Sequence, residues 1–413
     1  MVNQKIAAFL SKTQYCILLL LLFLMPFSRQ AIPPLIIAWI IVWSFNGNLR
    51  ENILAVFKSK IGILPVLFYF LHVIGMFYTS NQPEGRFDLE VKLSLFLFPL
   101  LMFGSASFIK EKLHSFLWCF VISNFVSSLI SFVVVIPKIS SQYYLYNDFT
   151  MFLHPTYGAM YVLFSISILV YFLFENKIPA WKNNISASLM KWLMLSLIAF
   201  FSVIVFLYSS RAGLITGIAI LFVSAAFFLY RKKINLFIKI LTIIGILSII
   251  VFIVNQNRRF VIFSKFLQSN SEVNYQVNEN VSVRYMVVVE TINLIQENFW
   301  TGVGTGDVKD VLVERYKLKG FKEAEKQNMN PHNQFLETTL GLGIISGLLL
   351  LVLTMMPLAA GIKHGNILLI FFSIIIIVNF TFECMFDTQA GVIFFAIFYS
   401  LLSSVKATPK INY

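Results

Sequence analysis

Residues 211–230 read RAGLITGIAILFVSAAFFLY, a single arginine followed by nineteen residues without another charge. An α-helix needs about 20 predominantly apolar residues to cross the hydrocarbon core of a membrane. The stretch therefore predicts a transmembrane helix that begins at Arg211. Runs of this kind recur along the chain, and they decide the fold class.

The composition of the whole chain agrees with this interpretation. Of the 413 residues, 58% are hydrophobic and only 12% are charged, and the mean hydropathy is +0.80. A soluble domain ordinarily carries about 25% charged residues. A transmembrane β-barrel would show short alternating segments in place of long apolar runs. We therefore expect an all-α polytopic membrane protein.

Twelve apolar segments are candidate transmembrane helices. They cover approximately residues 14–28, 31–46, 61–79, 93–109, 114–136, 156–175, 189–208, 212–230, 235–255, 334–360, 367–383 and 388–405. A polar loop of about 80 residues precedes the last three. We therefore expect about 12 transmembrane helices in three parts. These are an N-terminal bundle of about nine helices (1–255), a large loop with an amphipathic helix (256–333), and about three C-terminal helices (334–413).

The distribution of basic residues predicts the orientation. With a cytoplasmic N-terminus, the cytoplasmic segments hold sixteen lysines and arginines, and the short outer loops hold five. Cytoplasmic loops carry such an excess, whereas long translocated loops are largely exempt from the rule. We therefore expect both termini in the cytoplasm and the large loop on the extracytoplasmic side.

The net charge of +13 does not indicate nucleic acid, because the basic residues are scattered over short loops. In a membrane protein such an excess more often reflects topology and contact with anionic lipids or substrates. The three cysteines, Cys16, Cys119 and Cys384, have unrelated spacings. They indicate neither a metal site nor a disulfide framework.

Six separate segments bring ionisable residues to the outer face in this topology. These residues are Arg86, His154, Arg211, Arg284, His332, and the pair Glu383 and Asp387. Ionisable groups at apolar spans are costly and mark functional sites. Their convergence on one side of the membrane predicts a site there.

Arg211 and Arg284 are candidates for binding a diphosphate. Arg211 opens an apolar helix, where backbone N–H groups and the helix dipole also favour an anion. Arg284 lies in VSVRYMVVVETINLIQENFW (281–300), whose apolar spacing predicts a helix with Arg284 and Glu290 on its polar side. A guanidinium binds phosphate oxygens bidentately. The alternatives are a boundary arginine that snorkels to the interface and a solvated helix charge.

His332 is the candidate general base, because an imidazole has the near-neutral pKa needed to take a proton from a hydroxyl. Asn330 or Asn333 could cap the helix that follows. Asn333 or a nearby carboxylate could also hold the imidazole tautomer, and we include Asn333 among the substrate-binding candidates. The alternative for His332 is a polar residue at the start of a membrane helix.

His154, Glu383 and Asp387 are candidates for supporting roles, as hydrogen-bond partners or helix-end charges. A metal site built from the two histidines and these carboxylates is conceivable, but no local ligand spacing supports it. We therefore expect neither a metal nor another cofactor. The segment WTGVGTGD (300–307) predicts a tight turn, since it lacks the strand and helix context of a nucleotide fingerprint.

Several of these motifs resemble the O-antigen ligase family. The resemblance rests on SSRAG (209–213), Arg284 followed by WTGVGTGD, and PHNQFLETTLGLGIISG (331–347), and it is strongest over roughly residues 195–350. It implies a membrane glycosyltransferase of the all-helical, GT-C-like type in the bacterial inner membrane, with a periplasmic active site. It also implies an inverting, metal-independent transfer of a glycan from undecaprenyl diphosphate to an acceptor hydroxyl on lipid A-core or another glycan.

The resemblance also implies roles for particular residues. Arg211 and Arg284 would bind the lipid-linked diphosphate, and His332 would activate the acceptor hydroxyl. Arg86 would add to the anionic pocket, on a weaker local match. A ligase is the expected activity, with a repeat-unit polymerase as the alternative and a protein O-oligosaccharyltransferase sharing the same donor. A transporter of polysaccharide precursors is less favoured, because the chain shows no matching halves.

Overall fold

The computed structural model describes residues 4–45, 49–135, 151–175, 186–208, 210–231 and 279–405. These residues form α-helices, one 3-10 turn and connecting segments, with no strand among them. The elements are α1 (Gln4–Leu24), α2 (Ile32–Ser44), α3 (Leu49–Lys58), α4 (Ile63–Gly75), α5 (Gln82–Lys92), α6 (Ser94–Phe103), α7 (Ala106–Val135), α9 (Pro155–Phe174), α10 (Ala187–Tyr208), α11 (Arg211–Arg231), α14 (Glu279–Glu297), α15 (Val308–Lys319), α16 (Lys322–Lys326), α17 (Gln334–His364), α18 (Ile367–Phe382), η2 (Met385–Asp387) and α19 (Gln389–Ser404).

Helices overlap eleven of the twelve segments expected to span the membrane, and the remaining segment, 235–255, lies outside the described residues. Five described helices are long and apolar enough to cross a membrane on their own: α7, α9, α10, most of α11, and α17. A sixth span results if α2 and α3, which meet at 112°, form one bent crossing. Length and composition thus support five or six spans among the described helices.

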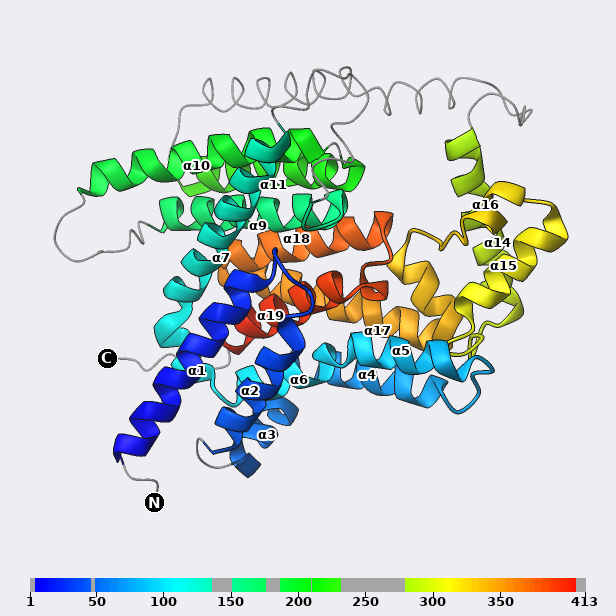
Figure 1. Ribbon diagram of the computed structural model, residues 1–413, viewed down its shortest axis with the longest axis horizontal. Coiled ribbons are helices and arrows are strands. Elements are labelled where there is room, and N and C mark those ends of the chain that lie inside the picture. Colours follow the sequence, from blue (N-terminus) through cyan, green and yellow to red (C-terminus); the bar gives the residue numbers. More distant parts are fainter. Residues whose placement is uncertain are drawn as a thin grey trace.

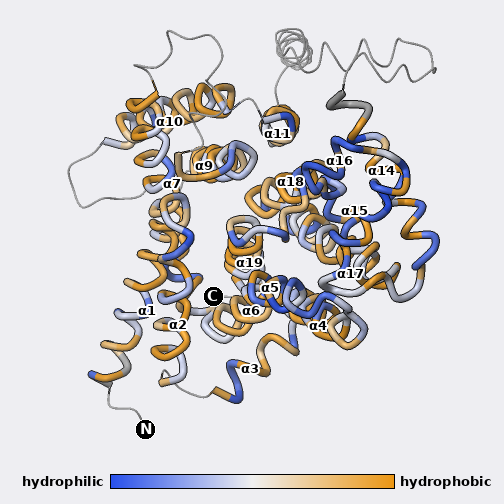
Figure 2. Tube along the Cα trace, turned by 45° about the vertical axis from the view of Figure 1, so that its right-hand side comes forward, coloured by the Kyte–Doolittle hydropathy of each residue, from blue (hydrophilic) through white to orange (hydrophobic). Residues whose placement is uncertain are grey.

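The C-terminal helix α19 lies in the middle of the apolar core (Figure 2). Every residue from Ala390 to Ser404 is buried. Phe398 packs edge-on against Phe120 of α7 and Phe164 of α9, with ring centroids 4.7 and 4.5 Å apart. Edge-to-face pairs of this kind are a favoured aromatic arrangement, so these phenylalanines join the N-terminal helices to the last one.

The three helices α14, α15 and α16 gather at one end of the molecule (Figure 1). They enclose a small apolar core of their own, with Val287, Leu294, Leu312 and Tyr316 almost fully buried. Hydrophilic residues concentrate on these helices and on α5 (Figure 2). This composition suits a layer outside the hydrocarbon core. The helix predicted over 281–300 is confirmed as α14 (Glu279–Glu297).

Glu290 does not lie on a polar face of α14 as predicted. Only 7% of the residue is exposed, and its carboxylate faces Arg315 at 3.6 Å and Lys319 at 4.0 Å, both on α15. A buried charge requires an opposite charge beside it, and the basic residues of α15 meet this requirement for Glu290. The sequence of α14 alone did not reveal them, because α15 follows later in the chain.

The turn at 300–307 docks into a break in α17. The backbone of α17 leaves helical geometry at Gly343, where φ is 76° and ψ is 178°. The N–H groups of Val303 and Gly304 donate to the carbonyl oxygens of Leu340 and Gly341, each at 2.9 Å, and Ile344 N donates to the oxygen of Phe299 at 2.9 Å. Backbone groups freed by the break are thereby satisfied.

The same turn is held on its other side by the connection between α4 and α5. Thr305 Oγ1 donates to the carbonyl oxygen of His72 at 2.7 Å. The two carboxylate oxygens of Asp307 accept from the backbone N–H groups of Ser80 and Asn81, both at 2.7 Å. The 300–307 turn therefore fixes α5 and α17 relative to each other, and both helices contribute to the sites described next.

Candidate functional site

His332 lies immediately before α17, between the end of α16 and the membrane-spanning helix. Its backbone adopts φ = 48°, a left-handed conformation that is uncommon outside glycine and marks functional sites when other contacts enforce it. Asn330 Oδ1 accepts from the backbone N–H of His332 at 3.2 Å. The side chain of His332 is 26% exposed, and its Nδ1 lies 3.6 Å from Glu383 Oε2.

Glu383 follows the last residue of α18 and faces both His332 and α9. Thr156 Oγ1, in the first turn of α9, donates to Glu383 Oε1 at 3.3 Å. Burial raises the pKa of Glu383, but His332, His154 and Arg284 outweigh it and hold the pKa below its ordinary value. The carboxylate is therefore ionised at neutral pH, as a partner of an imidazole must be.

His154 occupies the N-cap position of α9, next to the same carboxylate. Burial lowers the pKa of His154 from 6.5; Glu383 opposes this, while Arg29 and His332 lower the pKa further. His154 is consequently a neutral imidazole at pH 7. Arg29, from the connection between α1 and α2, was not among the predicted site residues.

Arg284 lies near this group on α14, and Arg211 begins α11 at the same end of the bundle. Arg284 is exposed on α14, and its charge is close enough to lower the pKa of Glu383. Arg211 is the first residue of α11, whose first turn packs on the first turn of α9: a Cβ added to Gly213 would lie 2.8 Å from Ala159 Cβ. The start of α11 therefore lies at the same end of the bundle as His154.

Residues 195–352, which include Arg211, Arg284 and His332, match the family model described as O-Antigen ligase. This match supports assignment to the O-antigen ligase family. No curated protein matches the chain. The O-antigen ligase match supports a membrane protein of the ligase or polymerase type, acting on glycan and lipid-linked substrates.

The O-antigen ligase segment does not contain every residue of this site. His154, Thr156 and Glu383 lie outside it, on α9 and at the end of α18. Thr156 stands two residues after His154 in the motif HPTYG. A hydrogen-bonding hydroxyl so close to a candidate site residue could have identified Thr156 from the sequence. Which carboxylate faces His332 depends on how α18 ends, and local sequence does not reveal it.

Three other predicted site residues have different surroundings. Asn333 caps α17, with its Oδ1 accepting from Leu336 N at 3.1 Å, as one of the two predicted caps. The carboxylate that pairs with His332 is that of Glu383, whereas Asp387 accepts from Asn330 Nδ2 at 2.9 Å. Arg86 is exposed on α5, a helix whose neighbouring residues line a separate cavity.

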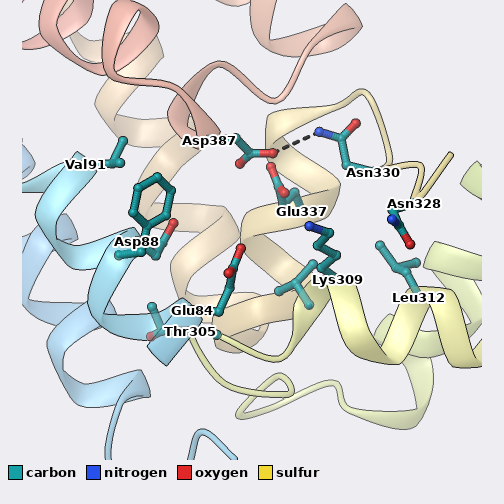
Figure 3. A pocket seen from close by; sticks show the side chains of 13 residues that line it. Glu84, Asp88, Val91, Thr305, Lys309, Leu312, Asn328, Asn330, Glu337 and Asp387 are labelled. Carbon is teal, nitrogen blue, oxygen red and sulfur yellow. Dashed lines mark hydrogen bonds between the residues drawn. The ribbon is translucent and has the colours of Figure 1, made fainter. Parts of the chain in front are cut away.

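This cavity, the acidic cavity below, has a volume of about 300 Å³ and lies between α5, α15, α17 and the 328–330 segment (Figure 3). Its polar lining includes Glu84, Asp88, Asn328, Asn330, Glu337 and Asp387. Beneath it, the ammonium of Lys92 is 5% exposed and pairs with Asp88. The sequence analysis did not predict this cavity, although Asp88 and Lys92 stand four residues apart, a spacing that favours an ion pair on a helix.

At the inner wall of the acidic cavity, Glu337, Cys384 and Asp387 bring their ligand atoms within 4.8 Å of one another. Burial raises the pKa of the Cys384 thiol and of the Asp387 carboxyl. A protonated thiol is a poor metal ligand, because metals bind the thiolate. These three residues are the described groups that could hold a metal, but their protonation favours hydrogen bonding instead.

Proposed function

We propose that the protein transfers a glycan from an undecaprenyl-diphosphate-linked donor to a hydroxyl of lipid A-core, on the periplasmic face of the inner membrane. The observation that carries the proposal is the His332–Glu383 pair, with Nδ1 and Oε2 3.6 Å apart, set beside Arg284. His332 and Arg284 both lie in the family-matched segment. We further propose a GT-C-like fold with about 12 spans, divided at residues 255 and 333.

In the proposed reaction, Glu383 holds the Nδ1–H tautomer of His332 and leaves Nε2 free to accept a proton. The acceptor hydroxyl gives its proton to Nε2, and its oxygen attacks the anomeric carbon of the donor sugar. The bond between that carbon and the diphosphate oxygen breaks with inversion, without a metal. This division of roles follows the general logic of a histidine base oriented by a carboxylate.

Arg211 and Arg284 bind the leaving diphosphate in this proposal. Two guanidiniums from separate helices can contact its oxygens and stabilise the negative charge that develops as undecaprenyl diphosphate departs. His154, neutral because burial lowers its pKa, adds no competing positive charge to the base. Asn333, as the cap of α17, supports the position of His332, and Arg86 remains a weaker candidate for the anionic site.

The test is transfer by purified protein supplied with lipid-linked donor and acceptor. His332→Asn removes the base but tolerates the left-handed backbone at φ = 48°, and we expect a loss of about 10²–10⁴-fold in rate. His364→Ala is the matched control, because His364 is exposed in the last turn of the same helix, α17. Full transfer by His332→Asn would refute the role of His332.

A second arm tests the donor site. Arg211→Ala with Arg284→Ala should raise the KM for the lipid-linked donor and lower kcat, since both arginines contact the group that leaves. Unchanged donor kinetics in this double variant would remove the diphosphate assignment. Release of undecaprenyl diphosphate by the detergent-solubilised protein also distinguishes an enzyme from a transporter. In detergent there are no two compartments to transport between, so the release reports glycan transfer.

A repeat-unit polymerase is the second candidate, and the charge of the acidic cavity favours it. Glu84, Glu337 and Asp387 line a space close to the segment that carries His332. Phosphate groups close to the acceptor hydroxyl would be repelled there, whereas the sugars of a repeat unit without charged groups would not be. Products formed with lipid A-core and with a second lipid-linked repeat unit distinguish the two activities.

A further inference from the structure

We infer that the acidic cavity binds one sugar ring of the acceptor, and that this ring is uncharged or bears an amine. The inference rests on the proposed function, because it assigns the acceptor side of that reaction. In that reaction Arg211 and Arg284 bind the donor diphosphate, and His332 takes the proton of the acceptor hydroxyl. The acidic cavity is lined by other residues, among them Asn328 and Asn330, just before His332 in the chain.

The first argument is the size and chemistry of the lining. About 300 Å³ is the lower end of the range for small-molecule sites, and it suits a single small ligand. Glu84 and Asn328 are exposed at the rim, while Glu337 and Asn330 are partly buried deeper in. Carboxylate and amide groups offer the acceptors and donors that ring hydroxyls need.

The second argument is the apolar part of the lining. Phe87 lines the cavity and is 57% exposed. Val91 on α5 and Val308 and Leu312 on α15 add apolar side chains. A sugar ring presents C–H groups as well as hydroxyls, and an exposed aromatic ring next to directional polar groups matches both. An inorganic cation would gain nothing from the apolar part of this lining.

The third argument is charge. Asp88 is neutralised by its pairing with the buried Lys92, and the raised pKa of Asp387 keeps a proton in the Glu337–Asp387 pair. Glu84 and the remaining carboxylate charge face one exposed ammonium, Lys309, across the cavity (Figure 3). The excess is negative, so a phosphorylated or carboxylated sugar is disfavoured.

The fourth argument is the connection to His332. Asn330 uses both ends of its side chain: Nδ2 donates to Asp387 in the cavity wall at 2.9 Å, and Oδ1 accepts from the backbone N–H of His332 at 3.2 Å. Two residues of chain span at most about 7 Å. A ring held against Asn330 therefore lies close to the proposed base and influences its position.

The test is ligand binding to the full-length protein, purified in a detergent without a sugar headgroup. Saturation-transfer NMR with galactose, glucosamine and glucose 6-phosphate reports binding independently of catalysis. Lys309→Trp places an indole at the rim of the cavity, and Lys317→Trp, exposed on the same helix, is its control. Glu84→Gln, with the exposed Glu90→Gln of α5 as its control, tests the charge.

We expect galactose and glucosamine to bind, and glucose 6-phosphate to bind more weakly. Lys309→Trp should lower the affinity for the bound sugars by at least about tenfold, equivalent to about 1.4 kcal/mol. Glu84→Gln should reduce the difference in binding affinity between glucosamine and glucose 6-phosphate. In transfer assays Lys309→Trp should raise the KM for the acceptor and leave the KM for the donor unchanged.

The outcomes separate this inference from the proposed function. Sugar binding that Lys309→Trp abolishes, in a protein that transfers no glycan, refutes the transfer and supports the sugar site. Transfer by the wild type, with acceptor KM and sugar binding unchanged in Lys309→Trp, refutes the acidic cavity as the acceptor site. Preference for glucose 6-phosphate, or no binding of any of the three sugars, refutes it as well.

Discussion

Replacing Gly343 with alanine should detach the 300–307 turn from α17. Gly343 has φ = 76° and ψ = 178°, a combination that is essentially restricted to glycine. A Cβ at this position would lie 2.0 Å from the carbonyl oxygen of Trp300. Because that oxygen belongs to the backbone of the docked turn, the clash can be relieved only by moving the turn away.

The expected cost has two contributions. The unfavourable backbone conformation accounts for about 1–3 kcal/mol. Undocking breaks the three backbone hydrogen bonds between the segment 299–304 and α17, each worth about 0.5–1.5 kcal/mol. Together they amount to about 2.5–7.5 kcal/mol. Gly320→Ala is the control, because Gly320 has φ = 72° and nothing within 4 Å of an added Cβ, so it carries only the left-handed penalty of about 1–2 kcal/mol.

Hydrogen exchange measured by mass spectrometry checks this prediction at the amides of Val303, Gly304 and Ile344. A change of about 2.5–7.5 kcal/mol in the docking free energy corresponds to exchange that is at least about 60-fold faster in Gly343→Ala. In Gly320→Ala these amides should keep the protection of the wild type. Equal protection in both variants would refute the docking argument.

Three further predictions concern charged side chains. Glu383→Gln should slow transfer by about 10²-fold. Because the pKa of Glu383 is lowered, the wild type should also have a higher free energy of unfolding than the variant at neutral pH. This difference should disappear as the pH falls below 4.5 in unfolding experiments. Asp387→Asn should have the opposite effect on the pH dependence of stability, because burial raises the pKa of Asp387 above 3.8. The free energy of unfolding of the wild type should fall as the pH rises through that raised pKa, whereas that of the variant should not. A wild type that shows no such loss of stability as the pH rises above 3.8 would contradict the assignment. Lys92→Met should destabilise the protein by about 1–3 kcal/mol by leaving the carboxylate of Asp88, which is 20% exposed, without its partner, and adding Asp88→Leu should restore most of that loss. If the double variant unfolds as easily as Lys92→Met, the ion pair is not the cause.

Helical elements followed from the sequence wherever the signals were local. The apolar run after Arg211 forms α11, and the Asn333 cap begins α17 as predicted. The break at Gly343 did not follow, because the groups that satisfy it come from residues 299–304, about 40 positions earlier.

The candidate site was predictable in its residue types and less so in its pairings. Ionisable groups beside apolar segments singled out His332, Arg284 and both C-terminal carboxylates. Glu383 and Asp387 stand four residues apart, but η2 intervenes and turns them to different partners, His332 and Asn330. The acidic cavity escaped prediction because α5, α15 and α17 meet there only through tertiary packing.

The contact of Glu383 with both Thr156 and His332 has a consequence for exchanging parts between related proteins. A chimaera that receives only residues 195–352 inherits the histidine but keeps its own carboxylate and threonine. In the recipient protein, the side chains at the positions equivalent to 156 and 383 evolved together with the segment that was replaced. We expect such hybrids to recover activity through compensating changes at these two positions, so sequencing the revertants would locate the contact by genetics alone.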